Sequence, residues 1–254
     1  MSGKPDPDSR NLIWLEKLRR GDVGLVGGKN ASLGEMLQSL DAARIRVPPG
    51  FATTAHAYRQ FVAENEIGEK LREHLERLAQ ERSTLATSGH AIRETIVSGT
   101  FPDALEADIR AAYRALGERV GRADPSVAVR SSATAEDLPD ASFAGQQETF
   151  LNVVGEEALL AACRRCFASL FTDRAITYRE LKGFDHLEVA LSIGVQLMVR
   201  ADIGGSGVMF SIDTESGFDK IVLINAAWGL GENVVQGAVS PDEYQVYKPF
   251  LDKP

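Results

Sequence analysis

The hydrophobic pattern of the chain changes its period near residue 125, and this change limits the folds that the sequence can adopt. Before that point apolar residues recur at helical spacing, as Leu71, Leu75 and Leu78 do. After it, short apolar runs alternate with turns of Gly, Asp and Ser, a pattern typical of strands. Helices followed by mostly antiparallel strands predict an α+β protein in two lobes.

This pattern also predicts how the chain divides. We expect a disordered tail over residues 1–10, a mainly helical lobe over 11–125 and an α+β lobe over 126–254. Because the chain stops directly after a predicted strand, we expect the second lobe to be incomplete at its C-terminus. Helices are predicted to begin near Asn30, Thr54, Gly68, Pro102, Glu156 and Ala175, and strands at residues 13–15, 126–130, 149–154, 190–199, 207–212, 221–225 and 244–247.

The composition argues against several classes of function. The 254 residues carry a net charge of −8 without a basic run, which disfavours a general nucleic-acid binder. No apolar run approaches the roughly 18 residues of a membrane span, and the first ten residues lack the apolar core of a signal peptide. We therefore expect a cytoplasmic protein that binds neither nucleic acid nor membranes.

The cysteines and histidines do not form a recognisable catalytic or metal site. Cys163 and Cys166 have the spacing of half a zinc or redox site, but no second pair lies nearby to complete four ligands. We expect them to be buried and structural. The histidines lack a nucleophile partner or a second ligand at i+4, and we expect surface or structural roles for His56, His74, His90 and His186.

Lys29 follows two glycines in Val26-Gly27-Gly28-Lys29-Asn30-Ala31-Ser32-Leu33-Gly34-Glu35-Met36. The segment is not a Walker A loop, because Asn30 replaces the Ser or Thr and Val23 replaces the first glycine of that pattern. If Asn30 or Ser32 caps a helix, Lys29 lies at a helix N-terminus, where N–H groups and the dipole attract anions. The alternative interpretation is an ordinary glycine turn with a solvated lysine.

Arg130 is a second candidate phosphate ligand. It ends an apolar strand and precedes Ser131, Ser132 and Thr134. An arginine that emerges into a hydroxyl-rich loop suits bidentate capture of phosphate, and the small residues that continue to Gly145 suit a lid over a nucleotide. The alternative is a capped surface turn with an Arg–Glu pair. Together, the lysine and arginine segments indicate a nucleotide triphosphate site.

Two further regions are less specific. The apolar run Val195-Gln196-Leu197-Met198-Val199 leads into a glycine turn and is either an adenine-binding strand or a plain core strand. Glu232 lies in Trp228-Gly229-Leu230-Gly231-Glu232-Asn233, which joins two predicted strands, and Glu215 lies in a Ser/Gly turn. Both carboxylates are candidates for metal or ribose contacts, although acidic residues in such turns often serve only the turn itself.

In this order, these segments resemble the N-terminal, ATP-grasp-like nucleotide-binding domain of the phosphoenolpyruvate synthases (pyruvate, water dikinases), which pyruvate phosphate dikinase and rifampin phosphotransferase share. The resemblance covers nearly the whole chain after the first ten residues. It implies an α+β, ATP-grasp-like, two-lobed domain that is truncated at its C-terminus and binds ATP with Mg²⁺. The matching segments are 26–36, 47–51, 129–145, 194–199, 206–217 and 228–243.

The resemblance also implies a reaction and residue roles. In this family, phosphates of ATP pass to a histidine on a swivelling domain, and a barrel domain then passes the phosphoryl group to pyruvate, giving phosphoenolpyruvate, AMP and phosphate. By resemblance, Lys29 and Arg130 contact the phosphates and stabilise charge during transfer. The remaining implied contacts are a closing loop of Ser131, Ser132, Thr134 and Gly145, an adenine hinge of Gln196, Leu197, Met198 and Val199, and ribose or metal contacts from Glu215 and Glu232.

The chain also departs from the family pattern. The later family segments that carry the magnesium ligands and a further phosphate arginine do not occur here, nor do the motifs of the swivelling histidine and the pyruvate barrel. The metal ligands are therefore unassigned, and we expect the chain alone not to complete the reaction. Two alternatives stay open: an ATP-binding domain of the rifampin phosphotransferase type, and a catalytically inactive nucleotide-binding or interaction module.

Overall fold

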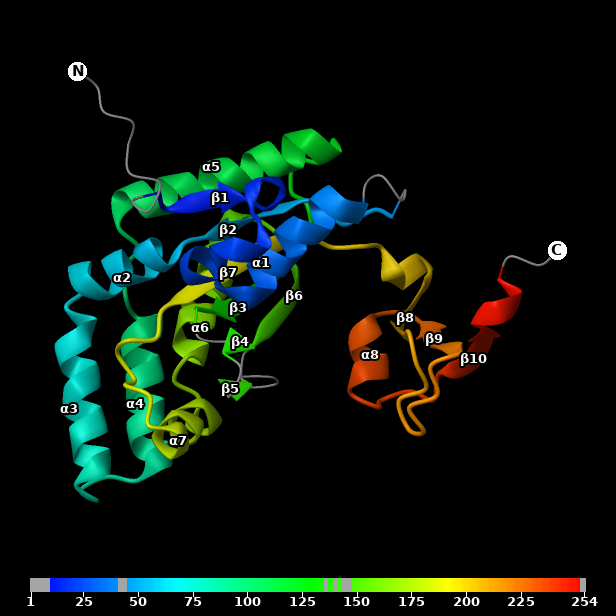
Figure 1. The fold of residues 1–254 in the computed structure, drawn as a ribbon. Helices are drawn as coiled ribbons and strands as arrows, with labels where there is room; N and C mark the ends of the chain where they lie inside the picture. Colours follow the sequence, from blue (N-terminus) through cyan, green and yellow to red (C-terminus); the bar gives the residue numbers. More distant parts are fainter. Residues whose placement is uncertain (1–9, 41–44, 135–136, 139–140, 143–147, 252–254) are drawn as a thin grey trace. The chain divides into compact units, whose positions relative to one another are not determined.

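The chain forms two compact units, Met1–Met198 and Val199–Pro254, which are described separately here (Figure 1). The computed structural model describes residues 10–40, 45–134, 137–138, 141–142 and 148–251. Nine of the ten residues of the predicted tail therefore lie outside the described residues. The division after Met198 differs from the lobes predicted on either side of residue 125.

The reason for this difference is the five-stranded antiparallel sheet of the first unit. Its strands come from both predicted lobes, so the sheet joins residues on either side of residue 125. Residues 50 and 51 of the matching segment 47–51 belong to a strand that the sequence did not predict, and all four residues of this strand are buried. In spatial order the strands are β1 (Leu12–Trp14), β2 (Gly50–Thr53), β7 (Leu191–Leu197), β3 (Val127–Ala133) and β6 (Thr149–Val153).

Helices cover this sheet, and most of them begin where the sequence predicts. Thr54 caps the second helix, because its hydroxyl accepts a hydrogen bond from the Ala57 N–H at 3.3 Å. The helix of residues 85–97 is an addition to the predicted set. The helices are α1 (Val23–Leu40), α2 (Ala55–Glu64), α3 (Ile67–Ala79), α4 (Leu85–Val97), α5 (Asp103–Val120), α6 (Glu156–Ser169) and α7 (Asp173–Lys182).

The two faces of the sheet differ in chemistry. The face that we call the apolar face packs into one large core with α2, α4, α5 and α6, and it carries Phe51, Val127, Val129, Ile193 and Val195. The opposite face, which we call the α1 face, packs against helix α1. Its small apolar cluster joins Ile13 and Ala52 of the sheet to Val26 and Ala31 of the helix.

Cys163 and Cys166 lie inside the large core. Both are free thiols and fully buried, which confirms the prediction that they are buried. Burial raises the pKa of Cys163 to about 12, because the thiolate loses its hydration. These cysteines therefore act as small apolar side chains.

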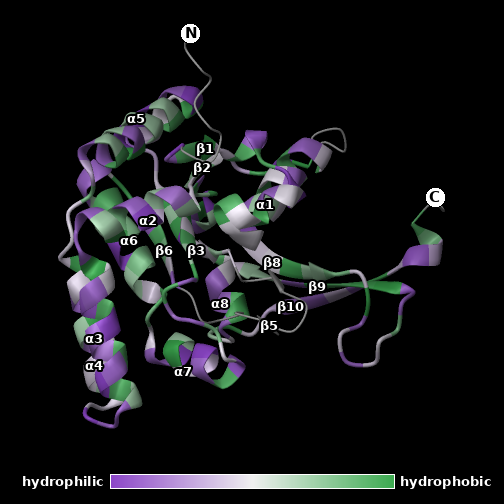
Figure 2. Ribbon diagram, turned by 60° about the vertical axis from the view of Figure 1, so that its left-hand side comes forward, coloured by the Kyte–Doolittle hydropathy of each residue, from purple (hydrophilic) through white to green (hydrophobic). Residues whose placement is uncertain are grey.

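The second unit is a three-stranded antiparallel sheet in the order β10, β9 and β8. It exposes large apolar side chains such as Trp228, which is 84% exposed, and Figure 2 shows hydrophobic colour along β9. Its elements are β8 (Gly205–Phe210), β9 (Ile221–Trp228), α8 (Gly231–Val235) and β10 (Asp242–Tyr247), while the short pair β4 (Asp137–Leu138) and β5 (Ala141–Ser142) belongs to the first unit. The mixture of helices and antiparallel strands confirms the α+β class.

None of the helices in the described part of the chain is both long and apolar enough to cross a lipid bilayer.

Candidate functional site

Helix α1 contains a break at Gly27. Gly27 has φ 74° and ψ 163°, so it interrupts the helical backbone, and a second helical segment begins after it. Gly28, Lys29 and Asn30 therefore occupy the first turn of that second segment. The first N–H groups of a helix have no partner within the helix, and together with the helix dipole they favour an anion. The predicted junction is thus present, although the residues before it are helical rather than a loop.

Gly27 packs directly against Ser132 of strand β3. A Cβ atom at Gly27 would lie 2.3 Å from the Ser132 hydroxyl oxygen and 2.5 Å from its carbonyl oxygen, a space that no other residue type fits. The Asn30 backbone N–H donates to the Ser132 hydroxyl at 3.4 Å. The lysine-bearing helix start is therefore held against β3, two residues from Arg130.

Arg130 lies on the same side of the sheet as this helix start. It is the one exposed residue of β3, whose other six residues are buried. Side chains alternate between faces along a strand, so Arg130 shares a face with Ser132, which contacts α1. Its neighbour across the sheet is Gly194 of β7, which also faces α1. Arg130 and the helix start that carries Lys29 thus lie on the same face of the sheet.

Arg130 is exposed to water, but nearby protein atoms remove part of the hydration of its guanidinium. Nearby protein atoms lower the pKa of its guanidinium from the ordinary value, because burial disfavours a charge. An arginine keeps its charge under such conditions. A less hydrated cation pairs more strongly with an incoming anion than a fully hydrated one.

The predicted closing loop does not begin where the resemblance implies. Ser131 and Ser132 lie within β3 and are buried, so they are strand residues with side chains on opposite faces. Ser131 donates its hydroxyl to the Glu148 carbonyl oxygen at 3.3 Å, and Thr134 donates its hydroxyl to the Ala190 carbonyl oxygen at 3.2 Å. Gly145 lies outside the described residues. Ser132 contacts the lysine segment through the Asn30 N–H.

The predicted adenine hinge coincides with the end of the first unit. The Leu197 N–H donates to the Pro49 carbonyl oxygen, and the Met198 N–H donates to the Ser126 carbonyl oxygen, each at 2.9 Å. Buried Gln196 donates its side-chain amide to the Pro48 carbonyl oxygen at 3.0 Å. These donors already serve the fold, so a purine contact here would use other atoms. Val199 is the first residue of the second unit.

The two predicted carboxylates lie at opposite ends of one hairpin in the second unit. Glu215 is in the turn between β8 and β9, and Glu232 is in the first turn of α8, after β9 ends. An eight-residue strand separates these ends by about 26 Å. The Glu215 N–H donates to Asp213, and Glu232 accepts from the Gln236 amide. The structure therefore does not bring them together.

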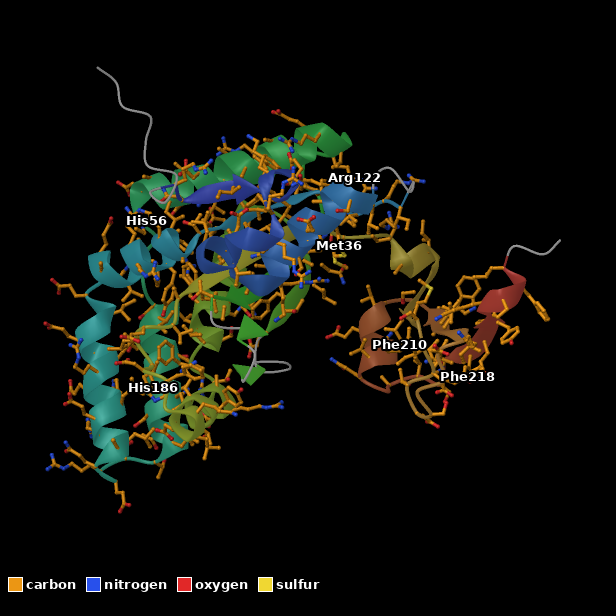
Figure 3. All side chains as sticks on the ribbon, in the orientation of Figure 1. Met36, His56, Arg122, His186, Phe210 and Phe218 are labelled. Carbon is orange, nitrogen blue, oxygen red and sulfur yellow. The ribbon has the colours of Figure 1, made fainter. Side chains whose placement is uncertain are left out.

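One of the histidines, His186, is part of a buried polar pair. Figure 3 shows His56 on α2 and His186 beside α7, in different places. The Arg179 Nε–H donates to His186 Nδ1 at 3.0 Å. Burial and the Arg179 charge lower the pKa of His186 to about 4, so its imidazole is neutral at pH 7. Among the residues that the structure describes, no group of three or more His, Cys, Asp or Glu is arranged to hold a metal ion.

Three residues near Lys29 have a role that the sequence reasoning missed. The Asn30 side chain is buried against β7, where it donates to the Ser192 hydroxyl at 2.9 Å. Gly194 leaves the space for this side chain, because a Cβ there would lie 2.2 Å from Asn30 Oδ1. The available signal was a serine and a glycine, two positions apart, in a strand that is otherwise apolar except for Gln196.

Comparison with known proteins agrees with this arrangement. A family model described as the pyruvate phosphate dikinase AMP/ATP-binding domain matches residues 23–252. The phosphoenolpyruvate synthase of Synechocystis sp. is 57% identical over 245 residues, covering 94% of this chain and 30% of the relative. The same-named protein of Escherichia coli is 56% identical over 241 residues, with 94% and 30% covered, and that of Aquifex aeolicus is 53% identical over 249 residues, with 98% and 29% covered.

The chain spans about 30% of the length of these curated relatives. The family match, in contrast, covers nearly the whole chain and includes both cationic segments. We conclude that the chain belongs to the pyruvate phosphate dikinase family of AMP/ATP-binding domains.

Proposed function

We propose that this chain is the ATP-binding part of a phosphoenolpyruvate synthase-like dikinase. In this proposal the site binds ATP with Mg²⁺, and the complete reaction converts ATP, pyruvate and water into AMP, phosphoenolpyruvate and phosphate. A phosphohistidine domain and a pyruvate-binding barrel, neither of which we assign to these residues, would accept and pass on the phosphoryl group. The ATP-grasp-like character of the fold is part of the same proposal.

The observation that carries the proposal is the meeting of two cationic segments on one sheet face. The Gly27-Gly28-Lys29 helix start packs against Ser132, and Arg130 precedes Ser132 by two residues on the same face. These segments are about a hundred residues apart in the sequence. A helix N-terminus that carries a lysine, packed against a strand that carries an arginine, suits a polyphosphate.

The functional groups of Lys29 and Arg130 suit a polyphosphate ligand. Lys29 offers an ammonium group with three donors, and Arg130 offers a planar guanidinium that can pair with two phosphate oxygens. Both cations would neutralise charge on the bound phosphates and on the oxygens that gain charge during transfer. The backbone N–H groups of the helix start would orient the ligand. We assign no protein ligand to Mg²⁺, which would enter with the nucleotide.

The adenine and ribose contacts are also proposed rather than established. The segment from Gln196 to Val199 would contact the base through its apolar side chains, because its Leu197 and Met198 N–H groups already bind carbonyl oxygens. Thr134 and Gly145 would belong to the closing loop. Glu215 and Glu232 would contact ribose or metal separately, since they lie at opposite ends of a hairpin.

Isothermal titration of the purified chain with Mg-ATP tests the proposal. We expect Lys29→Ala and Arg130→Ala each to weaken binding by about tenfold or more, since a charged hydrogen bond contributes about 1.5–3 kcal/mol. Lys70→Ala and Arg114→Ala serve as matched controls, because both residues are exposed and lie on α3 and α5.

The controls should bind Mg-ATP like the wild-type chain. Equal affinity of all five proteins would contradict the proposed site and favour an interaction module instead. We further expect the chain alone to form no phosphoenolpyruvate from ATP and pyruvate in a coupled assay. Measurable product would show that these residues suffice for the whole reaction.

A further inference from the structure

The side-chain amide of Asn30 joins three separate segments of the first unit. One N–H of Nδ2 donates to the Val26 carbonyl oxygen at 3.2 Å, which lies before the break in α1. The same nitrogen donates to the Ser192 hydroxyl of β7 at 2.9 Å. The Asn30 backbone N–H donates to the Ser132 hydroxyl of β3 at 3.4 Å. A single residue thus connects the two halves of α1 with two central strands.

This connection continues across the sheet. The Ser192 hydroxyl donates to the Thr53 carbonyl oxygen of β2 at 2.5 Å, and the Thr53 hydroxyl accepts the Ile193 N–H at 2.9 Å. All these polar groups are buried, and Asn30 is only 2% exposed. Buried hydrogen bonds that satisfy one another fix a unique geometry, because breaking any of them leaves an unpaired polar group. The start of the second helical segment is therefore fixed relative to β2, β3 and β7.

Lys29 needs a backbone that is fixed in this way. Its side chain has a flexible four-carbon stem, so binding through its ammonium group loses conformational freedom. The backbone immediately before it contains Gly27, which has more conformational freedom than any other residue type. Without a fixed attachment, the backbone that carries Lys29 would have to be ordered when a ligand binds.

We infer that Asn30 is a positioning residue for Lys29 in the proposed ATP site. Both donors of its amide are already used within the protein, so it acts on the ligand through Lys29 and not by direct contact. This inference rests on the proposed function, in which Lys29 contacts the phosphates. It adds that the lysine binds well only because Asn30, Ser192 and Ser132 hold the helix start in place.

A double-mutant cycle between Asn30 and Lys29 tests the inference by titration of the full chain with Mg-ATP. We expect Asn30→Ala to weaken binding about tenfold when Lys29 is present. In the Lys29→Ala background the same substitution should change binding by less than about twofold, because the residue that it positions is absent. Ser192→Ala removes the hydroxyl that accepts a hydrogen bond from the Asn30 amide. It should weaken Mg-ATP binding less than Asn30→Ala does, and this effect should also require Lys29.

Asn65 provides a matched control for a purely structural effect. Its side chain donates to the carbonyl oxygens of Phe61 and Thr100 and accepts the Thr100 N–H, each at 2.8 Å, at the end of α2. Asn65→Ala should lower the melting temperature, as Asn30→Ala does, yet leave the Kd for Mg-ATP within about twofold of wild type. Melting curves of every variant separate folding from binding.

The outcomes distinguish the two proposals. If Lys29→Ala weakens binding but folded Asn30→Ala and Ser192→Ala do not, the inference is wrong and the proposed site stands. An equal loss from Asn30→Ala in both backgrounds overturns the inference as well, because the effect then does not pass through Lys29. If the wild-type chain itself does not bind Mg-ATP, the proposed function and the inference fail together.

Discussion

The two faces of the five-stranded sheet use the same strands for different purposes. On the apolar face, side chains from strands and helices form one continuous core that contains the aromatic cluster Tyr58, Phe61, Phe101 and Phe167. The α1 face has only a small apolar cluster, and its centre consists of the buried polar groups around Asn30. The first arrangement stabilises the fold, and the second fixes the position of a charged segment.

In the proposed site, this contrast separates the residues that stabilise the fold from those that bind the ligand. Apolar packing does not depend on the exact direction of each contact, and it supplies most of the favourable free energy of folding. Hydrogen-bond networks contribute less net free energy but depend on exact donors and acceptors. We therefore expect substitutions on the apolar face to change stability, and substitutions on the α1 face to change ligand binding.

The largest expected effect is on the apolar face, from Phe167→Ala. Phe167 is fully buried, and its ring lies 5.2 Å from those of both Tyr58 and Phe61. Removing a buried ring leaves a cavity that costs about 3–5 kcal/mol of unfolding free energy. Urea denaturation measures this loss. If the variant that remains folded bound Mg-ATP more weakly than wild type, the separation between the two faces would be contradicted.

The next effect is on the α1 face, from Gly27→Ala. A Cβ at this position meets Ser132, and the positive φ of 74° disfavours any L-residue. Strain and overpacking together should cost about 2–4 kcal/mol and weaken Mg-ATP binding. Gly24→Ala is the matched control within the same helix, because nothing lies within 4 Å of its added Cβ.

Both glycine variants are compared by denaturation and by titration with Mg-ATP. The control should be as stable as wild type or slightly more stable, since alanine favours a helix. Equal behaviour of the two variants would show that close packing of α1 on β3 is unimportant.

A pH effect should arise on the apolar side, from His186. Its folded-state pKa is about 4, below the ordinary 6.5, because burial and the charge of Arg179 outweigh the carboxylate of Asp185. The carboxylate of Glu180 also faces His186, 3.9 Å from Nε2. Below pH 6.5 the unfolded chain takes up a proton that the folded chain does not. Stability should therefore fall as the pH drops from about 6.5 to about 4, by at most about 3 kcal/mol from this residue.

Thermal denaturation of wild type and His186→Asn between pH 4 and 7 measures this contribution. Asparagine keeps an acceptor for the Arg179 Nε–H but does not titrate. The difference between the two proteins should grow toward low pH in favour of the variant. A constant difference would mean that His186 titrates equally in the folded and unfolded states.

The smallest effects come from two adjacent serines that face opposite sides of β3. Ser131→Ala and Ser132→Ala should each cost about 0.5–1.5 kcal/mol, because each removes one hydrogen-bonding group. Only Ser132→Ala should weaken Mg-ATP binding, since Ser132 contacts the lysine segment. The same titration measures both variants, and a larger binding loss from Ser131→Ala would reverse the assignment of the two faces.

Much of the secondary structure could be predicted from the sequence, because it follows from local pattern. The helices predicted to begin near Gly68 and Glu156 agree with α3 and α6, and the strands at 126–130 and 221–225 agree with β3 and β9. Strand β2 was missed, because its four residues follow two prolines and are too few to show a period. Its identity as a strand depends on pairing with β1 and β7, which no local pattern contains.

The candidate site divides in the same way. Lys29 and Arg130 could be selected from residue type and context, and the resemblance supported both. The opposite orientations of Ser131 and Ser132 and the separation of Glu215 from Glu232 follow from strand alternation and hairpin topology, which become clear only once the strand boundaries are known.

The sequence by itself determined the α+β class, the buried cysteines and the family, and it selected the two cations of the proposed site. Periodicity and residue chemistry act over a few neighbouring positions, so they can be read without a structure. The tertiary structure alone decided that Asn30 meets Ser132 and Ser192, across 102 and 162 positions of the chain. Such contacts arise because the sheet closes around its core, and the core is assembled from residues that are distant in sequence.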